Sequence, residues 1–289
     1  MKRKYCLLVN ELSNSGKARS VIEQYKQQIE SILEDAEINF IKKGVSLSEV
    51  AELKSKSFEC IIACGGDGTA RSVAIALKGS DTKFGLLPLG SGNDFAKALG
   101  LSKSFVQNLE TIKQQSITEV DILRFNDQHF INTLGIGFDG LTNYLASKSI
   151  VKSDLKYVVA GFKALVLSKP FYVQIDTEKE SLKIESMMVI VANGSWEGGK
   201  YFVSPESRND DGISEIVIVK KVSKFRLLIE FIKLSLGSTF TPDIILKHKV
   251  KSCRIETSSD QYVHADGELV NNTSSFVINV EKEKIKALV

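Results

Sequence analysis

The first 120 residues alternate short apolar runs with segments in which apolar residues recur every three or four positions. Short apolar runs are typical of buried strands, and the recurring pattern is typical of amphipathic helices. In order, these segments are strand KYCLLVN, helix SGKARSVIEQYKQQIESILEDA, strand EINFIKK, helix SLSEVAELKSK, strand FECIIACGG, helix TARSVAIALKG and strand KFGLLPLG. This alternation predicts a parallel sheet covered by helices, with ligands bound beyond the carboxyl ends of the strands.

From about Asp121 the pattern changes to closely spaced strand-like runs joined by short polar turns. These runs are VDILRF, FYVQID, SMMVIVAN, ISEIVIVK, IILKHKV, CRIETS and SFVINV, with helical segments DLKYVVAGFKALVLSK and SKFRLLIEFIKLSLGS between them. Such spacing favours an antiparallel sandwich or barrel. We therefore expect an α/β domain over residues 1–122 and a largely β domain over residues 123–280.

Composition narrows the class of protein. The 289 residues are 43% hydrophobic, which is enough for one or two ordinary cores. Lys and Arg number 38 against 35 Asp and Glu, and this net charge of +3 lacks the positive excess of a nucleic-acid-binding protein. No apolar run is long enough for a signal peptide or a membrane span, so we expect a cytoplasmic protein. The cysteines are expected to be buried thiols in a reducing compartment: Cys6, Cys60, Cys64 and Cys253.

The stretch GGDGT follows the third predicted strand and opens a helix. Gly65, Gly66 and Gly68 would let backbone N–H groups approach phosphate oxygens near a helix N-terminus. An ordinary turn needs only one glycine, and Asp67 within the loop suggests a metal or hydroxyl partner. The loop is therefore predicted to bind phosphate.

A second loop, PLGSGNDFAKALG, follows the next predicted strand. Because parallel strands end at one edge of a sheet, Gly90, Ser91, Asn93 and Asp94 should lie beside Asp67. The alternative is that Asn93 or Asp94 only caps the following helix. Magnesium prefers oxygen ligands and keeps several waters, so we expect Asp67, Asp94 and Asp121 to hold it partly through water.

These two loops, with NELSNSG before them and HADGE after them, resemble the diacylglycerol kinase catalytic family, which includes soluble bacterial lipid kinases and the sphingosine and ceramide kinases. The resemblance spans nearly the whole chain and includes FINTLGIGFDG. It implies an N-terminal α/β nucleotide-binding domain, rejoined by residues 281–289, and a C-terminal β-sandwich. It also implies ATP in the cleft between the domains, with its phosphates on GGDGT.

The resemblance also implies roles for single residues. Asp266 matches the general base that accepts the lipid hydroxyl proton, Glu268 matches its acidic neighbour, and Asp67 is the rival base. Asp210 and Asp211 match a separate metal site, although a solvated turn closed by Gly212 would explain them equally well. The residues expected to bind the nucleotide are Asn10, Ser15, Gly16, Lys17, Gly65, Gly66, Asp67, Gly68, Thr69, Gly90, Ser91 and Asn93.

The chain departs from the family pattern at two places. Glu11 follows Asn10 where the family usually has proline, and Arg71 and Ser72 replace an amide and a glutamate. The second departure puts the nucleotide geometry in question.

Two other features favour packing over chemistry. Gly135, Gly137 and Gly140 have dinucleotide-fingerprint spacing, but they lie after the parallel region and lack the expected acidic residue. The three histidines lack metal-ligand spacing, although His264 lies two residues before Asp266 and so on the same face of a strand.

We expect an ATP- and Mg²⁺-dependent lipid kinase that converts diacylglycerol to phosphatidic acid. The alternatives are a kinase of a soluble hydroxyl compound such as NAD, and a catalytically silent lipid- or nucleotide-binding protein. The apolar stripe of SKFRLLIEFIKLSLGSTF favours packing on the β domain, with shallow contact at the inner membrane face as the alternative. The expected partners are ATP and a lipid at a membrane surface, with no nucleic acid; a homodimer is left open.

Overall fold

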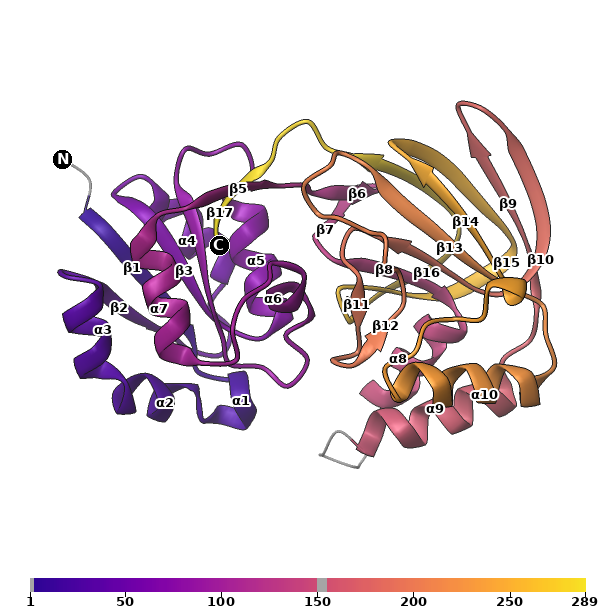
Figure 1. The fold of residues 1–289 in the computed structure, drawn as a ribbon, viewed down its shortest axis with the longest axis horizontal. Coiled ribbons are helices and arrows are strands. Elements are labelled where there is room, and N and C mark those ends of the chain that lie inside the picture. The colour runs from indigo at the N-terminus through magenta and orange to yellow at the C-terminus, as the bar shows by residue number, and fades with distance from the viewer. Residues whose placement is uncertain (1–2, 150–154) are drawn as a thin grey trace. The chain divides into compact units, whose positions relative to one another are not determined.

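The computed structural model describes residues 3–149 and 155–289, and the chain divides into two compact units (Figure 1). The first unit comprises Met1–Ile122 and Lys282–Val289. The second comprises Leu123–Glu281. Each unit has its own sheet and its own apolar core.

The first unit is built on a six-stranded sheet of order β2-β1-β3-β4-β17-β5. The strands β1 to β4 pair in parallel, as the alternating sequence pattern predicted. Strand β17 also pairs in parallel with β4, whereas β5 is antiparallel to β17. The strands are β1 (Arg3–Asn10), β2 (Glu37–Ile41), β3 (Phe58–Gly65), β4 (Lys83–Pro88), β5 (Ile117–Val120) and β17 (Ile285–Leu288).

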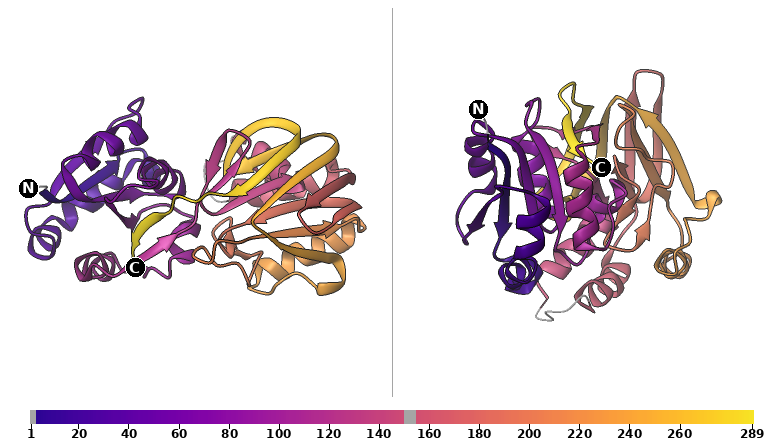
Figure 2. Two further views of the ribbon diagram at one scale, coloured as in Figure 1. Left: turned by 90° about the horizontal axis from the view of Figure 1, so that it is seen from above. Right: turned by 60° about the vertical axis from the view of Figure 1, so that its left-hand side comes forward.

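Helices lie on both faces of this sheet (Figure 2). They are α1 (Ser13–Gly16), α2 (Ala18–Gln24), α3 (Lys26–Ile32), α4 (Leu47–Ser55), α5 (Asp67–Ala76), α6 (Asp94–Ala98) and α7 (Phe105–Gln114). The sequence predicted one helix where α1, α2 and α3 form. The backbone departs from the helical conformation at Asn14 and Ser15, which have positive φ. Between α2 and α3 the Tyr25 N–H donates to the Val21 carbonyl at 3.1 Å and the Ile29 N–H to the Tyr25 carbonyl at 2.9 Å, so this part follows the predicted helix. The Tyr25 ring stacks on Phe105 with the two centroids 4.5 Å apart.

The chain returns to the first sheet at its C-terminal end. Strand β17 lies between β4 and β5, and Ile285 and Leu288 are fully buried there. A sheet that depends on residues from both ends of the chain can form only after the second unit has been synthesised.

The second unit is largely antiparallel. Its strands are β6 (Leu123–Phe125), β7 (Gln128–Phe130), β8 (Thr133–Gly137), β9 (Phe171–Thr177), β10 (Ser181–Ala192), β11 (Trp196–Glu197), β12 (Tyr201–Phe202), β13 (Ser214–Lys220), β14 (Ile245–Val250), β15 (Ser252–Ala265) and β16 (Glu268–Val280). Its helices are α8 (Phe138–Ser147), α9 (Leu155–Leu167), α10 (Lys224–Ser235) and the short 3-10 helix η1 (Pro242–Ile244).

Two long strands turn this sheet into two layers. Each of β10 and β15 pairs with β9 along its first half and with β8 along its second half. The register of β10 shifts between Ser186 and Met188, and the buried Ser186 hydroxyl accepts a hydrogen bond from the Met188 N–H at 3.0 Å. The irregularity bends the strand, so that its inward side chains share one core with those of β9 and β16.

Helices α8, α9 and α10 cover an apolar layer that includes Phe138, Ala164, Leu227 and Leu234. Within residues 3–149 and 155–289, no helix has the length and apolar character needed to cross a membrane. All four cysteines are buried and free, as expected, and burial raises the pKa of Cys6 to about 12.

We predict that the first unit depends on β17. Ile285→Ala should lower the free energy of unfolding by about 2–5 kcal/mol, because a fully buried isoleucine leaves a cavity. The matched control is Ile117→Ala in the adjoining strand β5, where the side chain is 46% exposed; it should cost under about 1 kcal/mol. Urea unfolding measures both, and equal effects would contradict the placement of β17 inside the sheet.

Candidate active site

Three loops of the first unit meet at the carboxyl edge of its sheet. Strands β1, β3 and β4 are parallel neighbours, so the segments that follow Asn10, Gly65 and Pro88 leave the sheet side by side. A Cβ atom on Gly90 would lie 2.6 Å from the Cα of Gly66, closer than any side chain allows. The two glycine-rich loops therefore touch through their backbones, which explains why both positions are glycine.

Thr69 connects the loop after β1 to the GGDGT loop. The Asn10 side-chain amide donates to the Thr69 hydroxyl at 2.9 Å, and the Ser13 hydroxyl lies 3.4 Å from it. A Cβ on Gly65 would lie 2.4 Å from the same Thr69 oxygen. Of the predicted nucleotide ligands, Asn10, Gly65 and Thr69 thus form one contact group.

Asp67 reaches from the start of α5 to the start of α6. Its Oδ1 accepts a hydrogen bond from the Phe95 N–H at 3.0 Å. Phe95 follows Asp94, whose Oδ1 lies 3.2 Å from the Lys97 Nζ. The structure therefore brings two of the predicted carboxylates to neighbouring loops, each with a polar contact of its own.

Asn93 stabilises the second glycine loop. Its Oδ1 accepts from the Gly90 N–H at 2.9 Å, and its Nδ2 donates to the Gly90 carbonyl at 2.7 Å. Asn93 occupies the N-cap position of α6 with φ 52°, but its side chain makes no capping bond. Ser91, at the tip of this loop, is exposed.

Glu11, which stands where the family usually has proline, pairs with an arginine of α2. Glu11 accepts a hydrogen bond from Arg19 Nε of α2 at 2.7 Å, and this ion pair holds the loop that proline would otherwise stiffen. Ser15 and Gly16 have positive φ, and with Lys17 they form an exposed turn.

At the second departure, the Ser72 hydroxyl donates to the Gly68 carbonyl at 2.8 Å, one turn earlier on α5. Ser72 thus bonds within its own helix. Arg71 is only partly exposed.

Asp121 does not join Asp67 and Asp94. Val120 pairs with Ile285, and β5 runs opposite to β17 and β4, so the end of β5 lies at the other edge of the sheet. There the buried Asp121 carboxylate lies 2.9 Å from the Lys284 Nζ. The expectation that Asp121 shares a metal with Asp67 and Asp94 was wrong, because the sequence pattern did not show the direction of β5.

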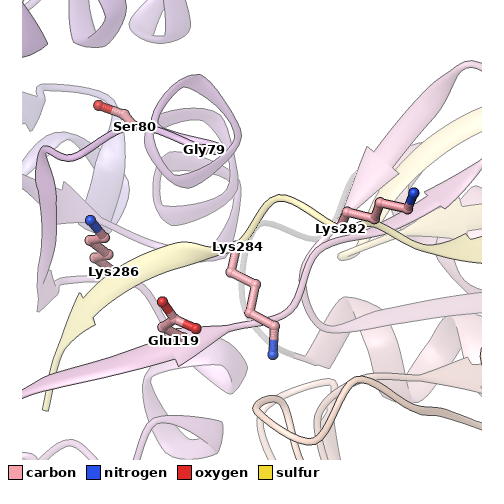
Figure 3. A pocket seen from close by; sticks show the side chains of 6 residues that line it. All are labelled: Gly79, Ser80, Glu119, Lys282, Lys284 and Lys286. Atoms are coloured by element: carbon pink, nitrogen blue, oxygen red, sulfur yellow. The ribbon is translucent and has the colours of Figure 1, made fainter.

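A pocket in the first unit lies near this ion pair (Figure 3). Two of its lysines have acidic partners: Lys284 contacts Asp121, and Lys286 lies 2.5 Å from Asp81. The pocket contains none of the predicted nucleotide ligands; its lining residues are Gly79, Ser80, Glu119, Lys282, Lys284 and Lys286.

In the second unit, Asp266 lies in the two-residue turn between β15 and β16. Asp266 and Gly267 both have positive φ, as a type I′ hairpin turn requires. The buried carboxylate accepts three backbone N–H bonds, from Ile131 at 2.9 Å, Asn132 at 2.8 Å and Thr133 at 3.1 Å. Asp266 thus joins the hairpin turn to the segment that leads into β8.

The other acidic candidates lie in more exposed places. Glu268 is the exposed first residue of β16, paired with Ala265 across the turn. Asp210 receives two hydrogen bonds from Arg208, at 3.1 and 3.2 Å. Asp211 accepts from the Ile213 N–H at 3.0 Å, an arrangement typical of a turn. The geometry at 210–212 therefore favours the solvated turn over a metal site.

The sequence did not predict a cluster of two carboxylates and a histidine in the second unit. Asp139 of α8, Glu197 of β11 and His264 of β15 place one ligand-type atom each within 4.8 Å of the others. These residues are far apart in the sequence, so no local motif could have shown them together. Its histidine, His264, precedes Asp266 by two residues in the sequence.

The chain matches two family models. The model described as diacylglycerol kinase catalytic domain covers residues 4–125, and the model described as YegS C-terminal NAD kinase beta sandwich-like domain covers residues 132–286. A diacylglycerol kinase of Bacillus subtilis is 30% identical over 234 residues, or 78% of this chain and 76% of the relative. One of Staphylococcus saprophyticus is 28% identical over 247 residues, or 83% and 80%.

Solved structures confirm the expected fold class, an α/β domain followed by an antiparallel β-sandwich. A diacylglycerol kinase of Bacillus anthracis has a TM-score of 0.76 at 22% identity and covers 99% of this chain and 96% of its own. An NAD kinase of Archaeoglobus fulgidus in complex with ATP has a TM-score of 0.56 at 14% identity, covering 99% and 93%.

We predict that Asp266 stabilises the second unit as well as serving any chemical role. Asp266→Ala leaves three N–H groups without their acceptor, and should lower the free energy of unfolding by roughly 3 kcal/mol or more. Asp211→Asn is the control, because its amide oxygen can still accept from Ile213; it should change stability by under about 0.5 kcal/mol. Urea unfolding tests this, and a fully stable Asp266→Ala protein would refute the prediction.

Proposed function

Because the chain belongs to the diacylglycerol kinase catalytic family, whose members are phosphotransferases with an alcohol acceptor, we propose that it phosphorylates a lipid hydroxyl with ATP. The preferred acceptor is diacylglycerol. Its hydroxyl oxygen attacks the γ-phosphorus, the bond between the γ-phosphorus and the β–γ bridging oxygen breaks, and ADP and phosphatidic acid are the products. The hydroxyl proton passes to a carboxylate of the enzyme.

The observation that carries this proposal is the backbone contact between Gly66 and Gly90 at the start of α5. Where no side chain intervenes, backbone N–H groups at a helix N-terminus can donate to phosphate oxygens. Asn10, Ser13 and Thr69 surround the same point with polar atoms. We assign the triphosphate of ATP to this surface.

The carboxylates of Asp67 and Asp94 fit a magnesium ion that keeps most of its waters, because they come from adjoining loops and offer only oxygen ligands. When bound, magnesium would neutralise charge on the phosphates. Asp121 has no part in this site, and its partner is Lys284.

For the base we favour Asp266. Its three N–H bonds fix the carboxylate in one orientation, which a group that must meet a substrate hydroxyl requires. Asp67, the rival, is bonded to the Phe95 N–H beside the glycine loops of the first unit. That position suits a role at the phosphates better than one at the acceptor.

An exposed apolar surface on α9 supports a lipid acceptor over a soluble one. On α9, Val158, Phe162 and Val166 recur at intervals of four and are exposed, and α9 has no acidic residue. Helix α10 contacts α9 (Figure 1), and the Lys224 side chain bonds to the Val166 carbonyl. An apolar face bordered by lysines suits the surface of an anionic membrane.

For helix α10 the sequence left two alternatives open, packing on the β domain and shallow contact with a membrane, and the helix has a face suited to each. Leu227 and Leu234 are buried against the sheet, so the helix does pack on the second unit. The predicted apolar stripe of Phe225, Leu228, Ile229, Ile232 and Leu236 is not the buried face of the helix: Phe225 and Leu236 are 73% and 79% exposed. We propose that they extend the α9 surface, and that the enzyme binds the inner leaflet peripherally.

We predict ATP-dependent formation of labelled phosphatidic acid from diacylglycerol in mixed micelles. Gly90→Ala should raise the KM for ATP about tenfold or more, because the added methyl meets the Gly66 backbone. Gly161→Ala, whose methyl meets nothing within 4 Å, is the control for the KM for ATP alone, because Gly161 lies on α9. Product from a soluble acceptor such as NAD, with none from lipid, would refute the proposed substrate; ATP binding without turnover would indicate a silent protein.

We also predict that the α9 surface recruits the enzyme to its substrate. The double variant Phe162→Glu, Val166→Glu should bind vesicles of phosphatidylcholine and phosphatidylglycerol about tenfold more weakly, since two apolar side chains no longer enter the bilayer. Val45→Glu, at an exposed valine of the first unit, is the control. Sedimentation with vesicles measures binding, and unchanged binding of the double variant would exclude this surface.

A further inference from the structure

The cluster of Asp139, Glu197 and His264, called here the histidine cluster, lies in the second unit, with the His264 ring buried and the two carboxylates partly exposed. The Nε2 of His264 lies 2.7 Å from Asp139 Oδ2 and 2.8 Å from Glu197 Oε1. The imidazole is 1% exposed. Groups of this type at this spacing can hold either a metal ion or shared protons.

The position of the ring proton argues against a metal. His264 Nδ1 accepts a hydrogen bond from the Gly267 N–H at 3.2 Å, so Nδ1 carries a lone pair in this arrangement. Against the effect of burial, Asp139 and Glu197 raise the pKa of His264, but a second ring proton on Nδ1 would face the Gly267 N–H donor. The ring therefore keeps one proton, on Nε2, the atom that faces both carboxylates. A metal-bound histidine would instead present a lone pair at Nε2 and an N–H at Nδ1. The geometry therefore fits an Nε2–H donor shared by two carboxylate groups.

Two links connect the histidine cluster to Asp266. Gly267, which donates to His264, directly follows Asp266 in the hairpin turn. Thr133 donates from its hydroxyl to Glu197 at 3.2 Å and from its N–H to Asp266 at 3.1 Å. The turn that carries the proposed base is thus held from both sides.

The contact between Asp139 and His264 requires glycine at position 135. A Cβ at Gly135 would lie 2.0 Å from Asp139 Oδ2 and 2.3 Å from His264 Nε2. Gly140 is likewise restricted by packing, since its Cβ would lie 2.0 Å from the Tyr262 carbonyl oxygen. The glycines that imitate a dinucleotide fingerprint therefore permit close packing.

We propose that His264 is a positioning residue that holds the Asp266–Glu268 turn through the Gly267 N–H, with Asp139 and Glu197 fixing the orientation of the ring. The inference rests on the proposed kinase function for its effect on catalysis. The hydrogen-bond arrangement itself can be tested without that function.

The protonation of Glu197 makes the arrangement sensitive to pH. Burial, and then the neighbouring Asp139, raise the pKa of Glu197 from 4.5 to about 8. The groups that face Glu197 are Asp139, His264, the Thr133 hydroxyl and, beside Asp139, Tyr201, whose pKa is raised by burial and by Asp139. Above about pH 8, Glu197 loses its proton and joins Asp139 as a second anion. The two carboxylates then compete for one Nε2–H.

The sign of the effect on stability follows from proton binding. The folded protein keeps the Glu197 proton up to about pH 8, whereas an unfolded chain releases it near 4.5. The stabilising contribution is therefore complete below pH 4.5 and is lost as the pH rises through about 8. Glu197→Gln keeps a neutral donor and acceptor, and should lose this pH dependence.

The first measurement is ¹⁵N NMR of the full-length protein at pH 7. We expect an unprotonated Nδ1 and a protonated Nε2 for His264, and slow hydrogen exchange at the Gly267 amide. A protonated Nδ1, or Gly267 exchange as fast as in an exposed loop, would overturn the proposal. Because no kinase assay is involved, failure of the proposed function leaves this result unaffected.

The second measurement compares variants in the micelle assay. His264→Phe keeps the ring volume without the polar atoms, and should lower kcat about tenfold or more while the KM for ATP stays within about twofold. Glu197→Gln should lower kcat less than His264→Phe does, because its amide oxygen can still accept from Nε2–H, and should lack the native decline above pH 8. Equal kcat for His264→Phe and the native enzyme would overturn the proposal, as would Zn²⁺ or Mn²⁺ binding that His264→Phe abolishes.

If His264→Phe does not fold, Glu197→Gln and the NMR measurement still decide the matter. A kinase-inactive native protein with the expected His264 tautomer would reject the proposed function alone. A kinase-active protein with the opposite tautomer would reject the positioning role alone.

Discussion

Hydrogen bonds from backbone N–H groups to a carboxylate distant in sequence hold the candidate sites of both units. In the first unit Asp67 accepts from Phe95, and in the second Asp266 accepts from three consecutive residues, Ile131 to Thr133. A buried N–H without an acceptor is costly, so these carboxylates are needed for folding as well as for chemistry. Loss of activity on replacing Asp266 therefore cannot by itself identify a general base, and stability has to be measured alongside turnover.

The sequence predicted the parallel sheet and its two glycine loops because both depend on local pattern. Gly66 and Gly90 follow adjacent strands, and the rule that parallel strands end at one edge brings them together without further information. Asp121 was misplaced because it follows β5, which is separated from β4 by β17 and pairs antiparallel with β17. Strand β17 comes from the far end of the chain. A local pattern cannot show strand order when a distant strand is inserted.

The histidine cluster was missed for a related reason. Asp139, Glu197 and His264 come from three separate elements, and each has an ordinary local explanation: a helix start, a short strand and a buried strand position. The only signal in the sequence was that Gly135 lies four residues before Asp139 and His264 two residues before Asp266. Gly135 and His264 become neighbours only when β8 and β15 pair.

The hairpin turn at Asp266 shows how stability and function are linked in this protein. A type I′ turn needs two residues that accept positive φ, and Asp-Gly meets that need without any catalytic demand. The same turn places one carboxylate against three N–H groups and one N–H against His264. Asp266 and Gly267 thus suit the backbone of the turn, and the neighbouring N–H groups fix the orientation of the Asp266 carboxylate. A hairpin turn does not need a carboxylate in a fixed orientation, whereas a general base does.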